Sequence, residues 1–318
     1  MRSQAKRIWG LIVMLATPGM CAACPIGISG VDQTTRVEEC DPIVRPSQVG
    51  SEEAGSTRDD SVAIQRHRAL ELFDRGKIVV VAHRGFAHRH PENTIVAIER
   101  AFELGADAVE VDVQITRDGV PILMHDATVN RTTNGTGSVA DLDFVEIAAL
   151  DACSWFGDQW LPCKVPTLRE ALVATRNHDG VLLLDLKPPM NTAELISILH
   201  DVQCTEMASG TIIMSFDLGI VSRMREMAPS VPVGLTTQQA PNPRELREAR
   251  LRFAAVSKLV LQENPLYPSE LANHQLATMA WTVTKESEVA FLTSTGAHFL
   301  ITDIPLTISD STSTPNTK

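Results

Sequence analysis

The sequence predicts a (β/α)8 barrel with a small inserted subdomain after the second strand region, and three observations support this. Short, nearly continuous apolar runs alternate with helical patterns between residues 77 and 305, as is typical of βαβ units with a buried parallel sheet. Eight such runs can be counted, which favours a closed barrel over an open doubly wound sheet. The chain has 318 residues, of which 44% are hydrophobic, and this length suits a single barrel of about 250 residues.

The first predicted strand, Lys77–His83, precedes a helix that begins near Asn93 or Thr94. The second strand is Asp107–Thr116. The other six are predicted over residues 180–187, 211–215, 231–236, 258–262, 278–283 and 298–303. Later helical patterns cover residues 167–176, 191–202, 217–227, 243–253 and 285–295. The long stretch 126–166 has no clear period, and we expect it to be the insertion.

The first 23 residues have the order of a signal peptide: a basic start, an apolar run over Ile8–Ala16, and small residues after it. A membrane span needs about 20 residues, and this apolar run is shorter, which favours a cleaved signal peptide. An uncleaved membrane anchor is the alternative. Cys24 after Ala22-Ala23 also resembles a bacterial lipoprotein site. We therefore expect an exported protein (periplasmic, secreted or surface-anchored), whose membrane contact would be an N-terminal lipid anchor.

Residues 24–69 are polar and aperiodic, as expected for a flexible tether, and residues 70–318 form the predicted barrel domain. Five of the six cysteines follow residue 23. Cys153 and Cys163 lie ten residues apart and could pair in an oxidising compartment, or could remain free thiols. The formal net charge of −11 is poorly suited to binding nucleic acid, so a small anionic substrate would need a local basic pocket.

Polar residues gather where the predicted strands end, which is the catalytic face of a (β/α)8 barrel. His83 closes the first strand. Glu110 and Asp112 share one face of the second, where they alternate with valines. Two inward carboxylates repel each other unless a cation bridges them, and a hard divalent ion, Mg²⁺ or Ca²⁺, suits oxygen ligands. Surface acids on an edge strand are the alternative.

A hairpin should return the chain to this pair of acids. Asp118-Gly119 is a strong signal for a two-residue loop. Such a loop would pair Arg117 with Val120 and place His125 opposite Asp112. We therefore expect a second histidine beside the metal site.

The third strand adds Asp185 and Lys187, two residues apart among leucines. A buried lysine needs an anionic partner. With Arg84, the predicted site combines acids, two histidines and two cations. This combination suits hydrolysis or rearrangement of a phosphodiester.

Several linked motifs, in this order, resemble the glycerophosphodiester phosphodiesterase family: "HRG" with "PENT", "EVDV" with "T.DG.P" and "HD", "DLKP", "SF", and "WTV" with "LITDIP". The resemblance covers residues 77–306. It implies a barrel with a small insertion, and hydrolysis of glycerophosphodiesters to glycerol 3-phosphate and an alcohol. It also implies one bound divalent cation.

The resemblance assigns roles residue by residue. His83 and His125 match the family's two catalytic histidines. Glu110, Asp112 and Asp185 match its metal carboxylates, although the last position is more often Glu in bacterial enzymes. Asp185 is one methylene shorter, which changes its reach toward a metal.

Other positions match substrate contacts. Arg84 and Lys187 match residues that face the substrate phosphate. Glu92 of "PENT" is expected to orient or neutralise His83 or Arg84. Trp281 could form an apolar wall for the glycerol, or could simply belong to the core.

The mechanism implied by the resemblance uses one histidine as base and the other as acid. A neighbouring glycerol hydroxyl attacks first, and water then opens the cyclic phosphate. His88 and His90 fall in the link before "PENT" and are expected to be ordinary loop residues, with substrate contact as the alternative. Two other functions fit the same sequence: a lysophospholipase D-like activity on larger lipids, and a non-catalytic exported binding protein.

Overall fold

The computed structural model describes residues 67–306. The predicted signal peptide, Cys24 and nearly all of the tether lie outside this range. The described chain begins with a helix, α1 (Arg68–Asp74), which starts within the last residues assigned to the tether. None of the helices between residues 67 and 306 combines the length and the apolar character needed to cross a membrane.

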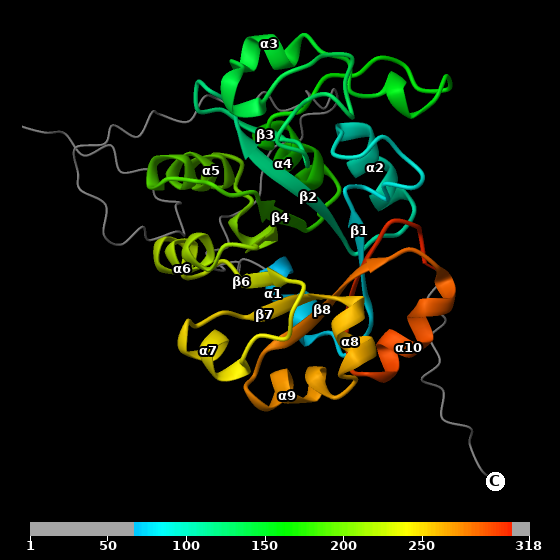
Figure 1. Ribbon diagram of the computed structural model, residues 1–318, viewed down its shortest axis with the longest axis vertical. Helices are drawn as coiled ribbons and strands as arrows, with labels where there is room; N and C mark the ends of the chain where they lie inside the picture. The colour runs from blue at the N-terminus through cyan, green and yellow to red at the C-terminus, as the bar shows by residue number, and fades with distance from the viewer. Residues whose placement is uncertain (1–66, 307–318) are drawn as a thin grey trace, which may run out of the picture.

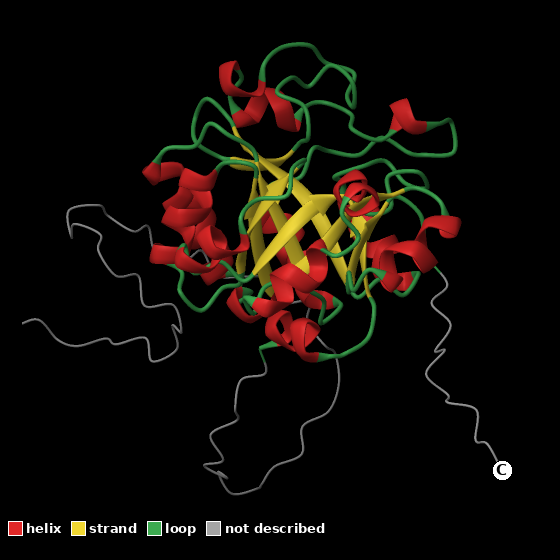
Figure 2. Ribbon diagram, turned by 60° about the horizontal axis from the view of Figure 1, so that its bottom comes forward, coloured by secondary structure: helices red, strands yellow, loops and turns green. Residues whose placement is uncertain are grey.

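Eight parallel strands form a closed ring, so the predicted (β/α)8 barrel is confirmed (Figure 2). Around the ring the order is β1, β2, β4, β5, β6, β7, β8 and β9, and β9 pairs with β1 to close it. A short ninth strand, β3, pairs antiparallel with β2. The bounds are β1 (Val79–His83), β2 (Ala108–Ile115), β3 (Pro121–Leu123), β4 (Leu182–Leu186), β5 (Thr211–Ser215), β6 (Val233–Thr237), β7 (Phe253–Ser257), β8 (Ala277–Val283) and β9 (Phe299–Thr302).

Helices surround the ring and cover its outer face (Figures 1 and 2). After α1 they are α2 (Ile95–Glu103), α3 (Phe144–Ala148), α4 (Leu168–Asn177), α5 (Thr192–Cys204), α6 (Leu218–Met227), α7 (Pro243–Glu248), α8 (Lys258–Glu263), α9 (Tyr267–Asn273) and α10 (Val289–Ser294). Short 3₁₀ turns are η1 (Val139–Asp141), η2 (Ser154–Phe156), η3 (Ala208–Gly210) and η4 (Glu286–Glu288).

Side chains alternate between the two faces of each strand, and the apolar core of the barrel therefore has an outer and an inner part. Val109, Val111 and Val113 of β2 face outward and pack with the helices. Residues such as Leu183 and Phe253 face inward and fill the barrel interior together. Because side chains alternate with a period of two, the residues between the outward valines must also point into the barrel.

The loop after β1 shows why its glycine is required. Gly85 has φ +82°, and a Cβ there would lie 2.5 Å from the Cβ of Ala97 in α2. Only glycine allows this approach. Thr94 is the N-cap of α2 and accepts a hydrogen bond from the backbone of Ala97 at 3.2 Å. The neighbouring candidate for this cap, Asn93, is therefore available for another partner.

The chain between β3 and α4 forms the predicted inserted subdomain. It contains η1, α3 and η2, and it packs its own small apolar core around Ile122, Val139 and Ile147. Figure 1 shows α3 and this segment beyond one end of the barrel. Cys153 and Cys163 form a disulfide with 5.3 Å between their Cα atoms, which resolves the two alternatives left by the sequence.

One predicted strand was misplaced. Residues 258–262 form helix α8, and the strand is β7 (Phe253–Ser257). The pattern had placed Phe253 at the end of a predicted helix and had left residues 254–257 unassigned. Short apolar runs do not distinguish a buried strand from a buried helix. Here β7 contains two alanines, and the side chain of Ser257 caps α8 by accepting from the Leu259 backbone at 3.4 Å.

The predicted hairpin register was wrong by one residue. Thr116 pairs with Val120, so the loop has three residues, and Gly119 takes φ +85° as such loops require. Met124, rather than His125, therefore lies opposite Asp112, and its backbone N–H donates to the Asp112 carbonyl at 3.0 Å. His125 still reaches the same end of the barrel because β3 has already ended at Leu123.

Candidate active site

A cavity of about 190 Å³ opens at the carboxyl ends of the barrel strands. Its walls contain residues from most of the strands together with His125, which follows β3. Of the nine residues predicted from the sequence, eight line it: His83, Arg84, Glu110, Asp112, His125, Asp185, Lys187 and Trp281. The ninth, Glu92, is not part of the lining but contacts Arg84.

Three carboxylates meet on one wall of the cavity. Glu110 and Asp112 share the inner face of β2, and the β2–β4 register pairs Asp112 directly with Asp185. Each offers an oxygen within 4.8 Å of the others, and their exposed fractions are only 1%, 1% and 4%. Burial and the nearby charge of Asp112 raise the pKa of Glu110 to about 7.

These three residues fit a divalent cation. The donor set is all oxygen, which a hard cation prefers. Oδ1 of Asp185 is buried without a hydrogen-bond partner, so it has a lone pair to offer. A cation here would also offset the charge repulsion that now raises the pKa of Glu110.

Lys187 lies against the same carboxylates. Its Nζ is 2.7 Å from Oδ1 of Asp112 and 2.5 Å from Oδ2 of Asp185. Burial lowers the pKa of Lys187, but these two acids outweigh it, so the net shift is upward. For Asp112, burial opposes ionisation, yet Lys187 and Arg84 hold the pKa well below its usual range. Both groups are therefore charged at neutral pH.

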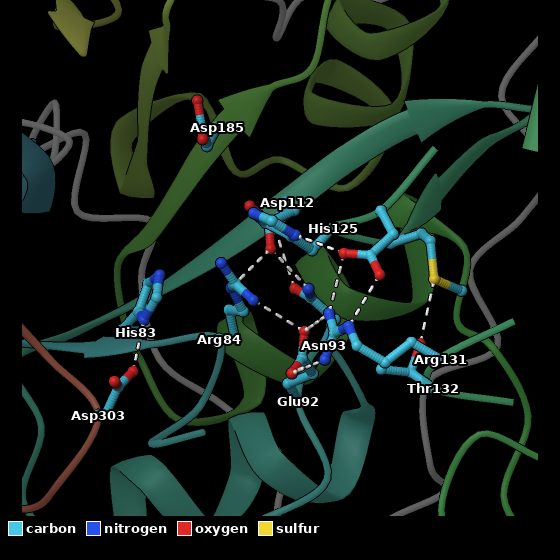
Figure 3. Close-up of polar contacts among 12 residues, drawn as sticks. His83, Arg84, Glu92, Asn93, Asp112, His125, Arg131, Thr132, Asp185 and Asp303 are labelled. Atoms are coloured by element: carbon cyan, nitrogen blue, oxygen red, sulfur yellow. Dashed lines mark hydrogen bonds and ion pairs between the residues drawn. The ribbon is translucent and has the colours of Figure 1, made fainter. Parts of the chain in front are cut away.

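His83 is oriented by a carboxylate from the far end of the chain. Its Nδ1 lies 2.5 Å from Oδ1 of Asp303, which follows β9 (Figure 3). Its Nε2 points toward Glu110, 3.9 Å away. Burial lowers the pKa of His83, but Asp303 and Glu110 raise it by more, and the net shift is upward.

His125 has a corresponding partner on the inserted side. Its Nδ1 lies 2.7 Å from Oδ1 of the adjacent Asp126. Arg131 holds that carboxylate through its Nε and one terminal nitrogen, at 2.8 and 3.0 Å. The same guanidinium donates twice to Glu92, at 2.8 Å each (Figure 3). Arg131 therefore links the His125 side of the cavity to the loop after β1.

Arg84 completes this network. Its NH1 donates to Glu92 at 2.9 Å, and its Nε is 3.0 Å from Oδ2 of Asp112. The sequence-based expectation that Glu92 neutralises His83 or Arg84 corresponds to the Arg84 contact. Asn93 also binds Asp112: its side-chain N–H donates to Oδ2 at 2.7 Å, and its Oδ1 accepts from the Asp112 backbone at 3.0 Å.

The two other histidines of the opening motif lie outside the cavity lining. His88 is 55% exposed, and its Nε2 is 3.5 Å from the far oxygen of Asp303. His90 is buried, contacts the Gly85 carbonyl through Nδ1 at 2.9 Å, and packs edge-on against Trp160. Trp281 lines the cavity, and its Nε1 donates to the Ala255 carbonyl at 2.9 Å.

Sequence reasoning missed several residues of this network. Asp303 lies within the recognised "LITDIP" stretch and Asn93 within "PENT", so both were marked by motifs without an assigned role. Asp126 belongs to "HD" in the same way. Arg131 lies in the aperiodic insertion, where no pattern indicated its two carboxylate partners.

Comparison with known proteins identifies the relatives of this chain. The sequence profile of the glycerophosphoryl diester phosphodiesterase family matches residues 83–307. A glycerophosphodiester phosphodiesterase of Caldanaerobacter subterraneus subsp. tengcongensis is 32% identical over 237 residues, which are 73% of this chain and 96% of that protein. One from Bacillus subtilis is 31% identical over 255 residues, 74% of this chain and 86% of that protein.

Solved structures show the same likeness. The crystal structure of glycerophosphodiester phosphodiesterase from Agrobacterium tumefaciens is 27% identical and superposes with a TM-score of 0.63, covering 72% of this chain and 97% of that one. The family match spans most of the barrel and all eight predicted residues that line the cavity. The chain therefore belongs to the glycerophosphoryl diester phosphodiesterase family.

Proposed function

We propose that this protein hydrolyses glycerophosphodiesters to sn-glycerol 3-phosphate and an alcohol. The observation that carries the proposal is one cavity lined by two histidines, each fixed at Nδ1 by an aspartate, beside three buried carboxylates. The relatives named above are glycerophosphodiester phosphodiesterases, which supports this substrate class.

In this mechanism the two imidazoles exchange protons with the reacting groups. One removes the proton of the attacking hydroxyl, and the other protonates the departing alkoxide. The raised pKa of His83 favours its protonated form, so we assign the acid role to His83 and the base role to His125. Both act through Nε2, since each Nδ1 is bound to its aspartate.

The cationic side chains bind and orient the phosphate. Arg84 and Lys187 line the cavity and are held in place by Glu92, Asp112 and Asp185. Glu110, Asp112 and Asp185 would hold one divalent cation, Mg²⁺ or Ca²⁺, which when bound withdraws charge from a phosphate oxygen. A glycerol hydroxyl next to the phosphate is the proposed first nucleophile, and water completes hydrolysis.

A second substrate class is favoured by the rim of the cavity. Phe216 is 44% exposed and packs edge-on against Trp281, with 5.6 Å between ring centroids. Leu218, close to it in sequence, is 52% exposed. This apolar rim could accept the chain of a lysophospholipid, as a lysophospholipase D-like enzyme requires.

One assay separates these functions. Purified protein is given a panel of glycerophosphodiesters and lysophospholipids, with and without chelator, and released glycerol 3-phosphate and lysophosphatidate are measured. We expect glycerol 3-phosphate from the small diesters. Preferential release of lysophosphatidate would favour the second class, and the absence of any product would favour a binding protein.

We also propose that the protein acts outside the cytoplasm. The basic, apolar and small-residue order of residues 1–24 supports this, and the Cys153–Cys163 disulfide suits an oxidising compartment. Mass spectrometry of the mature N-terminus tests it. A new terminus after Ala23 indicates secretion, a lipid-modified Cys24 indicates anchoring, and an intact Met1 in a cytoplasmic protein contradicts export.

A further inference from the structure

The cavity has two chemically unlike halves. The charged residues come from β1, β2 and β4 and from the chain after β3. The opposite wall is largely apolar. It carries Met214 on β5, Phe216 just after it, Trp281 on β8 and Ile301 on β9, together with three uncharged polar residues, Thr236, Gln238 and Thr282. A phosphate held by the charged half therefore leaves the organic group of the substrate against the apolar half.

Thr236 interrupts this apolar wall with a hydroxyl. It lies on β6, which is diametrically opposite β1 in the ring of strands and hence opposite His83. Val233 and Leu235 pack on the outer core, so alternation turns Thr236 into the barrel, where it lines the cavity.

The hydroxyl of Thr236 has no partner. The residue is only 3% exposed, and its Oγ1 makes no hydrogen bond. Among the described side-chain atoms that are buried without a partner, it is the one on the apolar half of the cavity. An unpaired buried hydroxyl is destabilising, whereas Trp281 on the same wall has its N–H satisfied.

We propose that Thr236 forms a subsite for the terminal hydroxyl of the substrate's glycerol group. This rests on the proposed function. The glycerol hydroxyl next to the phosphate must face phosphorus on the charged half, so the terminal hydroxyl extends toward β6. A threonine hydroxyl both donates and accepts, and can therefore pair with an alcohol in either direction. Thr236 thus selects glycerol over diols that lack this group.

The chain provides a matched control. Thr175 in α4 is 0% exposed, and its Oγ1 is also buried without a partner, but it does not line the cavity. Replacing either threonine by valine keeps the shape of the side chain and removes a hydroxyl that has no partner in the free protein. Both variants should therefore fold with unchanged or slightly increased stability.

The test measures kcat/KM for wild type, Thr236→Val and Thr175→Val on two diesters. One is sn-glycero-3-phosphocholine, and the other is the analogue made from propane-1,2-diol, which lacks the terminal hydroxyl. We expect Thr236→Val to lose about 10-fold on the glycerol diester, and wild type to lose a similar factor on the analogue. On the analogue, Thr236→Val should equal wild type, and Thr175→Val should equal wild type on both.

Equal losses of Thr236→Val on both diesters, or no loss on either, would overturn the subsite. If wild type turns over neither diester, the proposed function fails separately. The subsite is then decided by calorimetry with glycerol 3-phosphate and propane-1,2-diol phosphate. Weaker binding of the glycerol compound alone by Thr236→Val supports the subsite, and unchanged binding refutes it.

Discussion

The carboxylate of Asp303 lies 2.5 Å from Nδ1 of His83, a residue 220 positions earlier in the chain. This contact fixes the imidazole so that Nε2 faces the cavity. Asp303→Asn would keep the size of the side chain but lose its charge. We expect kcat to fall by roughly 10²–10⁴-fold with little change in KM, since the protonated imidazole loses the carboxylate that stabilises its charge and holds its orientation.

A double variant separates positioning from structure. Asp303→Asn should cost nothing further in a His83→Ala background, because the aspartate acts through that imidazole. A further loss in the double variant would show a role for Asp303 independent of His83. Thermal unfolding of each variant checks that the barrel remains closed.

Replacing either cavity histidine by alanine should lower turnover by about 10²–10⁴-fold while leaving the fold intact. His178→Ala is the control, because His178 is exposed at the end of α4 and outside the cavity lining. His88→Ala should cost far less than either cavity variant, although its imidazole contacts Asp303. If His83 is the acid, its variant should lose less on a diester with a p-nitrophenol leaving group, which departs without a proton. A large loss for His88→Ala with none for His125→Ala would contradict the assignment.

Exhaustive chelation should abolish turnover, and Mg²⁺ or Ca²⁺ should restore it, because Glu110, Asp112 and Asp185 then regain their cation. Asp112→Asn should show the same loss in the presence of metal. Circular dichroism before and after chelation establishes that the barrel persists. Full activity after complete metal removal would exclude a cation from the reaction.

Without a cation, the stability of the protein should depend on pH through Glu110. Its pKa of about 7 lies above the value of an unfolded glutamate, so the folded state binds the proton more tightly. The contribution of Glu110 to the free energy of unfolding is fully present below about pH 4.5 and is lost as pH rises through about 7. Thermal unfolding should show added Mg²⁺ raising Tm more at pH 8 than at pH 5. Glu110→Gln should reduce this difference, and the remainder reflects Asp185, whose pKa burial also raises.

Arg131→Ala should lower the free energy of unfolding by about 2 kcal/mol, because Glu92 and Asp126 each lose a charged donor. Arg117→Ala is the matched control. It removes only exposed ion pairs with Asp143 and Glu146, so it should lower the free energy of unfolding less than Arg131→Ala does. Urea unfolding measures both, and equal effects would show that the Arg131 links contribute no more than surface ion pairs.

The sequence predicted the barrel because alternation and apolar runs are local properties. It placed seven of the eight barrel strands. It missed β7, whose alanines gave no strand signal, and it wrongly predicted a strand in the apolar run that forms α8. Pattern alone cannot decide such short segments, since a central strand and a buried helix both consist of apolar residues.

A cavity residue could be predicted from the sequence where a charged side chain interrupts an otherwise apolar strand. Glu110, Asp112, Asp185 and Lys187 meet this condition. His125 was identified through a register that proved one residue wrong, so its place was predicted for an incorrect reason. Thr236 could not be identified, because a threonine in a strand is ordinary until its lack of a partner is visible in three dimensions.

The seam between β1 and β9 has a consequence for biosynthesis. These strands pair where the ring closes, and the contact between His83 and Asp303 exists only once β9 is in place. A nascent chain therefore cannot orient His83 until β9 and Asp303 have been translated. Chains truncated before β9 should be catalytically inactive even though they contain both histidines and all three carboxylates of the cavity.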